Sequence, residues 1–204
     1  MLDILEQFRE NIRRVQALGG LYDALSQQTT LALDLTDLLR SQIVMVVSAL
    51  DHYVHEITRI GMLEVYSGKR PQTPAFLRFQ ITMEATLQGI AAVPSNDGWL
   101  DEEIRKKHGY LAFQHPDRIA DAIRLFSNCT LWISVASELN LEVEDVKTEL
   151  QLIVNRRNQI AHEADLDSRT PGGNRFTISS SDTKRIINLI FLKSIKESVI
   201  INRS

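Results

Sequence analysis

The residues best suited to catalysis lie together in one polar run, Arg156-Arg157-Asn158-Gln159-Ile160-Ala161-His162. An arginine is a permanent cation whose planar guanidinium fits phosphate oxygens, and a histidine can move a proton near neutral pH. The run follows the helix-forming segment 149–154, so a predicted helix becomes polar where its apolar stripe should continue. Such a change indicates either a solvated helix end or a site, and these residue types favour a site for phosphate chemistry.

The spacing of Arg157 and His162 limits how they can act together. Five residues of an α-helix turn by about 500°, which leaves the two side chains about 140° apart. They converge only if the helix ends near Ala161 or if a second copy of the chain supplies the complement. The alternative is a solvated helix end, where both side chains interact with the last carbonyl groups.

The run from Arg157 to His162 has the form Arg–x(4)–His and resembles the motif of the HEPN superfamily. Two segments after the motif, 163–167 and 171–178, are similar to the RiboL-PSP branch of that group. The predicted helix around residues 46–54 shares this similarity. The resemblance therefore rests on the motif together with its flanking loop and one further helix.

This resemblance covers about residues 35–200, with a less typical insertion at about 68–115. It implies an all-α fold, a HEPN-type helical bundle with extra helices in the middle of the chain, and a single domain over residues 1–204. Many HEPN domains are endoribonucleases that need no metal ion or other cofactor, and they dimerise so that two motifs meet in one cleft. The implied partners are RNA, a second copy and, in toxin–antitoxin, phage-defence or RNA-processing settings, an antitoxin or another protein.

The resemblance also implies roles for the motif residues. Arg157 and His162 are the expected catalytic residues. Asn158 is the polar residue expected to orient the site, since its amide can donate to a phosphate or hold the histidine tautomer. Arg156 is expected to face a phosphate of the substrate. For Asn158 and Arg156, an ordinary place on the solvated helix surface is the alternative.

A second polar cluster lies on the predicted long helix and consists of Asp51, His52, His55 and Glu56. The pairs Asp51–His55 and His52–Glu56 are four residues apart, so each pair can touch. Such spacing also fits zinc, but no third ligand is evident. The cluster is either a solvated helix face, or Asp51 or His52 faces the motif helix and supports Arg157 on the substrate side.

Arg105, Lys106 and Lys107 form the only concentrated basic patch of the chain, and Tyr110 follows them closely. Basic side chains beside an aromatic ring can hold phosphates of the substrate and stack one of its bases. The acidic run 101–103 comes directly before the patch, so charge pairs along a helix are the alternative interpretation.

The motif is followed by three acidic residues, Glu163, Asp165 and Asp167. A hard metal ion needs several converging oxygen ligands, and these residues with His162 could supply some of them. Capping and loop hydrogen bonds, with Arg169 or Arg175 as a partner, are the preferred interpretation. No metal site is therefore predicted.

Composition places the chain among ordinary globular proteins, with 44% apolar and 24% charged residues in a length of 204. The net charge of −3 excludes a uniformly basic surface, so any contact with RNA must be local. No apolar run is long enough to span a membrane, and no secretion signal is visible. The single cysteine, Cys129, excludes an intramolecular disulfide and agrees with a cytoplasmic location.

Apolar periodicity predicts helices along most of the chain, and no strand-like alternation persists. The expected helices cover residues 2–18, 34–66, 75–90, 99–113, 116–126, 132–139, 142–162 and about 181–200. Gly19-Gly20 is the expected end of the first one. The motif therefore lies at the end of the next-to-last helix.

Two rival functions remain open at this point. Many HEPN domains have lost activity, so the chain could be a non-catalytic helical module that dimerises and binds a partner protein. An arginine-rich cleft could also hold a nucleotide without cleaving it. The sequence has no glycine-rich phosphate loop, no nucleophile elbow and no paired cysteine motif.

Overall fold

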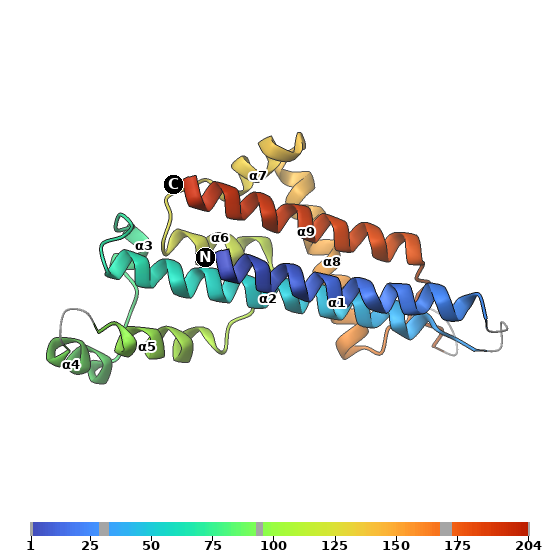
Figure 1. Ribbon diagram of the computed structural model, residues 1–204, viewed down its shortest axis with the longest axis horizontal. Coiled ribbons are helices and arrows are strands. Elements are labelled where there is room, and N and C mark those ends of the chain that lie inside the picture. The colour runs from blue at the N-terminus through green and yellow to red at the C-terminus, as the bar shows by residue number, and fades with distance from the viewer. Residues whose placement is uncertain (1, 29–32, 93–95, 168–172, 204) are drawn as a thin grey trace.

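The computed structural model describes residues 2–28, 33–92, 96–167 and 173–203 of the chain. Within these stretches there are nine α-helices and no strand, which confirms the predicted all-α fold (Figure 1). The nearest approach to a sheet is an isolated antiparallel bridge between Leu166 and Arg175. In this described part of the chain, no helix is long and apolar enough to cross a membrane.

Four long helices form the body of the molecule. α1 (Leu2–Ser26) and α2 (Thr36–Tyr66) form an antiparallel hairpin, α9 (Ser180–Arg203) packs against both, and α8 (Val143–His162) crosses α2 (Figure 1). They share one apolar core, whose buried side chains include Phe8, Ile12, Val47, Tyr53, Val54, Leu150 and Ile190. Because α2 touches each of the other three helices, it is the central element that positions the rest.

α1 continues through Gly19 and Gly20, where the sequence predicted its end. The prediction was wrong because Gly19 serves packing here and does not form a turn. A Cβ atom at Gly19 would lie only 2.7 Å from Nε2 of Gln42 on α2. This amide nitrogen donates to the carbonyl oxygen of Val15 at 2.8 Å. A residue without a side chain therefore lets the two helices approach closely enough for a buried hydrogen bond between them.

The single helix predicted over 75–90 is in fact two, α3 (Pro74–Leu77) and α4 (Met83–Ala91). Thr82 starts α4, because its hydroxyl accepts a backbone N–H in the first turn. Its own N–H donates to the buried carboxylate of Glu103 at 2.9 Å. This contact between residues distant in sequence fixes a new helix start that apolar periodicity alone cannot reveal.

Three shorter helices, α5 (Gly98–His108), α6 (Pro116–Arg124) and α7 (Leu131–Leu139), complete the fold. α6 and α7 agree with the predicted helices at 116–126 and 132–139. The helix predicted over 99–113 ends earlier, at His108, because the following loop is tied to α2. There, the carboxylate of Asp51 accepts hydrogen bonds from the backbone N–H of Phe113 and from the side-chain amide of Gln114.

α5 docks against α2 through a second, smaller apolar cluster formed by Met62, Leu100 and Ile104. The segment 68–115 therefore carries a small core beside the main one. The description of the chain as one domain with an atypical insertion stays a prediction.

α5 ends on a buried histidine. His108 is 5% exposed, its ring lies edge-on to those of Phe79 and Phe113, and its Nδ1 has no hydrogen-bond partner. Burial, together with the neighbouring His55, lowers the pKa of His108 from 6.5 to about 4. The imidazole is therefore neutral in the folded protein at neutral pH.

We expect acidification to destabilise the fold through His108. Its pKa is lower in the folded than in the unfolded protein, so the unfolded state binds more protons between the two values. Stability should therefore fall as the pH drops from about 6.5 towards about 4, by at most roughly 3 kcal/mol. Urea unfolding at neutral pH and near pH 5 measures this loss, and His108→Leu should reduce it. The exposed His52, replaced by leucine, is the matched control; an equal loss in His108→Leu and the parent protein would contradict the assignment.

Candidate active site

Arg157 occupies a position on α8 where an apolar residue would be expected. Val146, Leu150 and Ile153 are buried at a spacing of four and three residues, and Arg157 follows four residues later on the same stripe. Its Nε is buried without a hydrogen-bond partner, while Nη1 donates to Oδ1 of Asn158 at 3.1 Å. Among the described residues no carboxylate pairs with Arg157. A desolvated cation without a counter-charge is costly, so packing alone does not explain this arginine.

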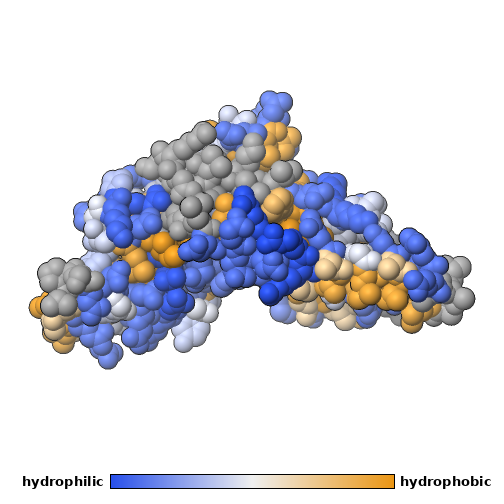
Figure 2. Space-filling model, viewed as in Figure 1, coloured by the Kyte–Doolittle hydropathy of each residue, from blue (hydrophilic) through white to orange (hydrophobic). Residues whose placement is uncertain are grey.

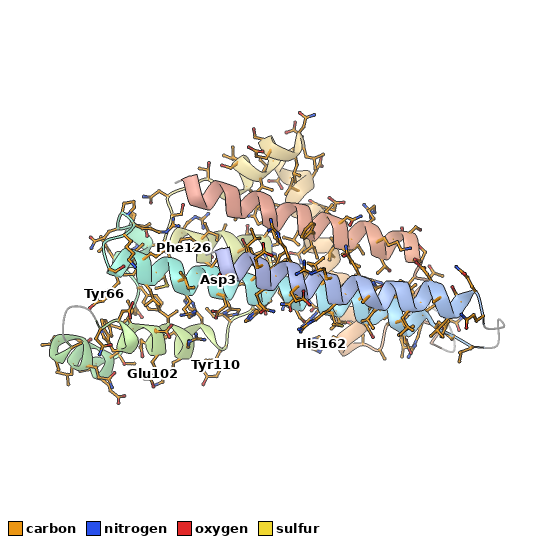
Figure 3. The ribbon with its side chains drawn as sticks, in the orientation of Figure 1. Asp3, Tyr66, Glu102, Tyr110, Phe126 and His162 are labelled. Atoms are coloured by element: carbon orange, nitrogen blue, oxygen red, sulfur yellow. The ribbon has the colours of Figure 1, made fainter. Side chains whose placement is uncertain are left out.

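His162 is more exposed than Arg157. It is the last residue of α8, is exposed, and is followed by the C-cap Glu163 (Figure 3). Because α8 remains helical through His162, the side chains of Arg157 and His162 diverge by about 140°. Asn158 precedes His162 by four residues and so shares its face of the helix. The hydrogen bond from Arg157 to Asn158 therefore links the half-buried arginine to the exposed face of the histidine.

A buried carboxylate fixes the end of the motif helix. Asp165 is only 1% exposed and accepts hydrogen bonds from two arginines, Arg40 on α2 and Arg156 on α8. Nε of Arg40 lies 2.6 Å from Oδ2, and Nη2 of Arg156 lies 3.0 Å from the same oxygen. The backbone at Asp165 adopts the left-handed conformation with φ of 60°, and its N–H donates to the carbonyl oxygen of Gln159 at 3.0 Å.

The same group of charges holds the loop that leads to α9. The backbone N–H of Phe176 donates to the carbonyl oxygen of Asp165 at 2.9 Å, and Nη2 of Arg40 donates to that of Phe176 at 2.9 Å. The guanidinium of Arg156 lies 5.2 Å from the centre of the Phe176 ring and donates to the carbonyl oxygen of Thr177. These contacts hold Phe176 and Thr177 beside the end of the motif helix.

These contacts change the interpretation of the residues beside the motif. Asp165 was expected to pair with Arg169 or Arg175, but its partners are Arg40 and Arg156. Arg175 instead binds Asp37, and Arg169 lies outside the described residues. Arg156 therefore has a partner within the chain, and its contact with substrate stays a prediction.

Arg40 is a residue that the sequence reasoning missed. It is buried, although it lies on the long apolar helix α2 beside Leu39 and Ile43. An arginine among core positions of a helix is a signal that could have been noticed, because such a charge needs a partner. The sequence offers no way to select Asp165 as that partner.

A hollow of about 400 Å³ opens beside the end of the motif helix. Its apolar wall consists of Val44 and Met45 on α2, Ile160 on α8 and Ala164 just after α8. Asp37 and Arg175 form a polar rim. The hollow gives the motif end a concave surface of the kind in which ligands bind.

Asp51 and His52 were expected on the substrate side, next to the motif helix. Both oxygens of Asp51 are engaged by the loop before α6, so this residue positions that loop. His52 is exposed and lines hollows of about 170 and 280 Å³, against α1 and α5 respectively. The structure shows no hydrogen bond from either side chain to α8, and their contact with substrate stays a prediction.

The basic patch lies in the last turn of α5. Arg105 forms ion pairs with Asp101 and Glu56, and Nζ of Lys107 lies 3.9 Å from Glu103. Charge pairs along the helix thus exist, as the alternative interpretation expected, but they leave Lys106 exposed and without an ion pair to any described residue. Substrate binding by Arg105, Lys106 and Lys107 stays a prediction.

The acidic residues after the motif do not gather into a metal site. Among the described residues, no group of three or more histidine, cysteine, aspartate or glutamate side chains could hold a metal ion. Asp165 is occupied by its two arginines, and Glu163 caps α8 through its backbone.

Comparison with known proteins identifies one family. A family model described as RiboL-PSP-HEPN matches residues 9–200, which includes α2, the motif helix and the loop that Asp165 holds. The HEPN group consists of helical domains whose functions are RNase-like and related to RNA. Neither a curated protein nor a solved structure matches the chain.

We expect Asp165→Ala to destabilise the protein strongly. The substitution leaves Arg40 and Arg156 without their shared counter-charge, and Arg40 is only 6% exposed. Removing one partner of a buried ion pair lowers the free energy of unfolding by about 3–5 kcal/mol. Urea unfolding measures the loss, and Asp165→Asn gives a second value if the alanine variant does not fold. Asp121→Ala, which breaks the exposed pair with Arg124 on α6, should lower the free energy of unfolding by only about 0–1 kcal/mol; equal losses would contradict the central role of Asp165.

Proposed function

The chain belongs to the RiboL-PSP-HEPN family, and on that premise we propose that it is an endoribonuclease that cuts RNA without a metal ion. The observation that carries the proposal is Arg157. It stands on the core-facing stripe of α8, partly desolvated, without an acidic partner among the described residues, and joined through Asn158 to the face of His162. A half-buried cation in such surroundings is suited to an anionic ligand, and a phosphate of RNA supplies that charge.

The proposed reaction uses the 2′-hydroxyl of the RNA as the nucleophile. A neutral His162 takes the proton of the 2′-hydroxyl, O2′ attacks the adjacent phosphorus, and the bond from phosphorus to O5′ breaks. A second, protonated His162 gives its proton to O5′, so the products are a 2′,3′-cyclic phosphate and a free 5′-hydroxyl. Arg157 stabilises the negative charge that develops on the phosphorus oxygens, and Asn158 holds the guanidinium in place.

The geometry of α8 supports a site shared by two chains. The helix stays regular through His162, so one chain alone does not bring Arg157 and His162 to one face, and it holds only one motif histidine. We propose a homodimer whose interface is the apolar end of the α1–α2 hairpin, where Leu21, Leu33 and Met45 are exposed. Figure 2 shows apolar surface gathered at this end of the hairpin, beside the charged middle of α1. Met45 also lines the hollow beside the end of α8, so the interface would lie near both copies of the motif helix.

A ribonuclease of this kind would act as a toxin, a defence effector or an RNA-processing enzyme, with an antitoxin or another protein as a possible regulator. The competing proposal is a non-catalytic module that dimerises and binds a partner or a nucleotide. The two proposals differ in a single observable, cleavage of RNA that depends on His162.

We expect His162→Ala and Arg157→Leu each to reduce RNA cleavage by about 100-fold or more, because each removes a group that acts in the transition state. Arg157→Leu should also keep or raise the free energy of unfolding, since leucine suits the apolar stripe. The assay follows cleavage of single-stranded RNA with EDTA present. Glu163→Ala, at the same helix end, is the matched control and should cut normally.

The same assay tests the nucleophile. An RNA with one 2′-deoxy residue at a mapped cleavage position should resist cutting there, because the attacking oxygen is missing. Continued cutting at that position would refute the cyclising mechanism. Loss of cutting both on EDTA treatment and in Glu163→Ala would instead establish metal-dependent chemistry at the acidic residues after the motif.

We expect the protein to act as a dimer with a shared site. In an equal mixture of parent and His162→Ala chains that have exchanged subunits, only about one quarter of the dimers keep both histidines. Cleavage should therefore fall to about that fraction, and light scattering at micromolar concentration should give the mass of two chains. Activity that falls only to one half, in proportion to the parent chains, would show that each chain works alone.

A further inference from the structure

Tyr110 is the most exposed large side chain that bears an apolar surface in the described part of the molecule. The side chain is 91% exposed, and the next residue, Leu111, is 47% exposed. Figure 3 shows Tyr110 at the end of α5, along the same lower edge of the view as His162. Exposed apolar side chains that adjoin one another often mark a binding surface.

The loop that carries Tyr110 is held firmly on both sides. The N–H groups of Gly109 and Leu111 donate to carbonyl oxygens in the last turn of α5, each at 2.9 Å. Nε2 of His55 donates to the carbonyl oxygen of Leu111 at 3.2 Å, and Asp51 accepts the N–H of Phe113. The exposure of Tyr110 therefore does not come from a frayed loop. Its ring is presented on a fixed backbone, so a ligand that stacks on it has little further ordering to impose.

Cationic side chains lie directly before this ring. Arg105, Lys106 and Lys107 occupy the last turn of α5 and precede Tyr110 by five, four and three residues. Asp101 and Glu56 compensate Arg105, whereas Lys106 is exposed and has no ion pair with a described residue. On a chain of net charge −3, this is a local surface that can attract phosphates.

One stripe of α2 connects the motif to this loop. Met45 lines the hollow beside the end of α8, and Ser48, His52 and His55 follow it at spacings of three and four residues. These residues share one face of α2, and His55 contacts the Tyr110 loop. Ten residues of helix separate Met45 from His55, a rise of about 15 Å, which a few nucleotides of single-stranded RNA can span. The carboxylates of Asp51 and Glu56 border this face, and both are engaged, Asp51 by the loop before α6 and Glu56 by Arg59.

We propose that Tyr110 is a stacking platform for a base of single-stranded RNA, a few nucleotides from the cleaved bond. Lys106 and Lys107 hold the neighbouring backbone phosphates, and the strand between the platform and the motif lies along the Ser48–His55 face of α2. This proposal rests on the proposed function. It also explains how a chain without a basic surface can hold its substrate: a single aromatic contact supplements a small number of charges.

The cations distinguish this surface from an ordinary site for a protein partner. α4 carries an apolar stripe of Met83, Leu87 and Ile90, all exposed, and none of its residues is basic. By contrast, Tyr110 combines an aromatic ring with three basic residues, the pairing that single-stranded nucleic acids require. The α4 stripe therefore offers a matched control for an exposed apolar side chain outside the proposed RNA path.

The experiment measures binding of a short single-stranded RNA to full-length His162→Ala protein, in which the strand stays intact. The RNA carries 2-aminopurine at successive positions near a mapped cleavage position, and stacking on an aromatic ring changes its fluorescence. We expect Tyr110→Phe to keep both the affinity and the fluorescence change. Tyr110→Leu should weaken binding by about tenfold or more and abolish the change, because base–aromatic stacking contributes about 1–3 kcal/mol. Lys106→Gln should weaken binding and lower the salt dependence by about one phosphate contact.

Leu87→Ala is the control on α4 and should bind RNA like its parent. Equal binding by Tyr110→Leu and Tyr110→Phe would overturn the stacking platform. A change of oligomeric state in Tyr110→Leu would also overturn it, and would assign this loop to an interface between copies. These outcomes are separate from failure of the proposed function, which would appear as absence of cleavage by the parent protein and absence of binding by His162→Ala.

Discussion

The carboxylate of Asp165, buried between Arg40 and Arg156, is the interaction on which the arrangement of the motif depends. Its side chain joins α2 to the end of α8. Its backbone carbonyl oxygen accepts a hydrogen bond from the N–H of Phe176, in the segment that leads to α9. A buried carboxylate is tolerated only when its charge and lone pairs are satisfied, and here two guanidinium groups do so. Since the two arginines come from different helices, the pairing also specifies where α8 ends relative to α2. His162 is thereby held in place, although its side chain has no hydrogen bond or ion pair to a described residue.

The two neighbouring arginines of the motif helix have opposite surroundings, although the sequence gives them equal prominence. Arg156 is neutralised by Asp165 and stacks near Phe176, so its charge serves the fold. Among the residues that the structure describes, Arg157 has only the amide oxygen of Asn158 as a hydrogen-bond partner, and its Nε is buried and unpaired. An arginine that is partly removed from water and has no counter-charge is suited to bind an anion, because the ligand would supply the missing negative charge. A functional group often conflicts with local packing in this way, and the buried pair beside it stabilises the surrounding structure.

α2 organises the molecule because its different sides contact different parts of the structure. One side packs into the shared core against α1, α8 and α9. Half-buried polar residues on another side meet α5 and the loop that follows it: Asp51 and His55 bind that loop, and Arg59 pairs with Asp101 on α5. The regular geometry of a single long helix thus relates the motif at one end to the basic patch and Tyr110 farther along. In the proposed function, the length of this helix sets the distance between the cleaved bond and the bound base.

The sequence by itself determined the all-α fold, the long helix α2, the motif helix α8 and the identity of the candidate catalytic residues. Helical periodicity and residue chemistry are local properties, and they can be read from neighbours within a few positions. Only the tertiary structure decided which charges meet. Arg40 and Asp165 are 125 positions apart, Asp51 reaches the loop before α6, and Glu103 fixes the start of α4. Gly19, expected to end a helix, instead allows two helices to approach. Partners of this kind depend on how helices pack in space, so no spacing within one segment can identify them.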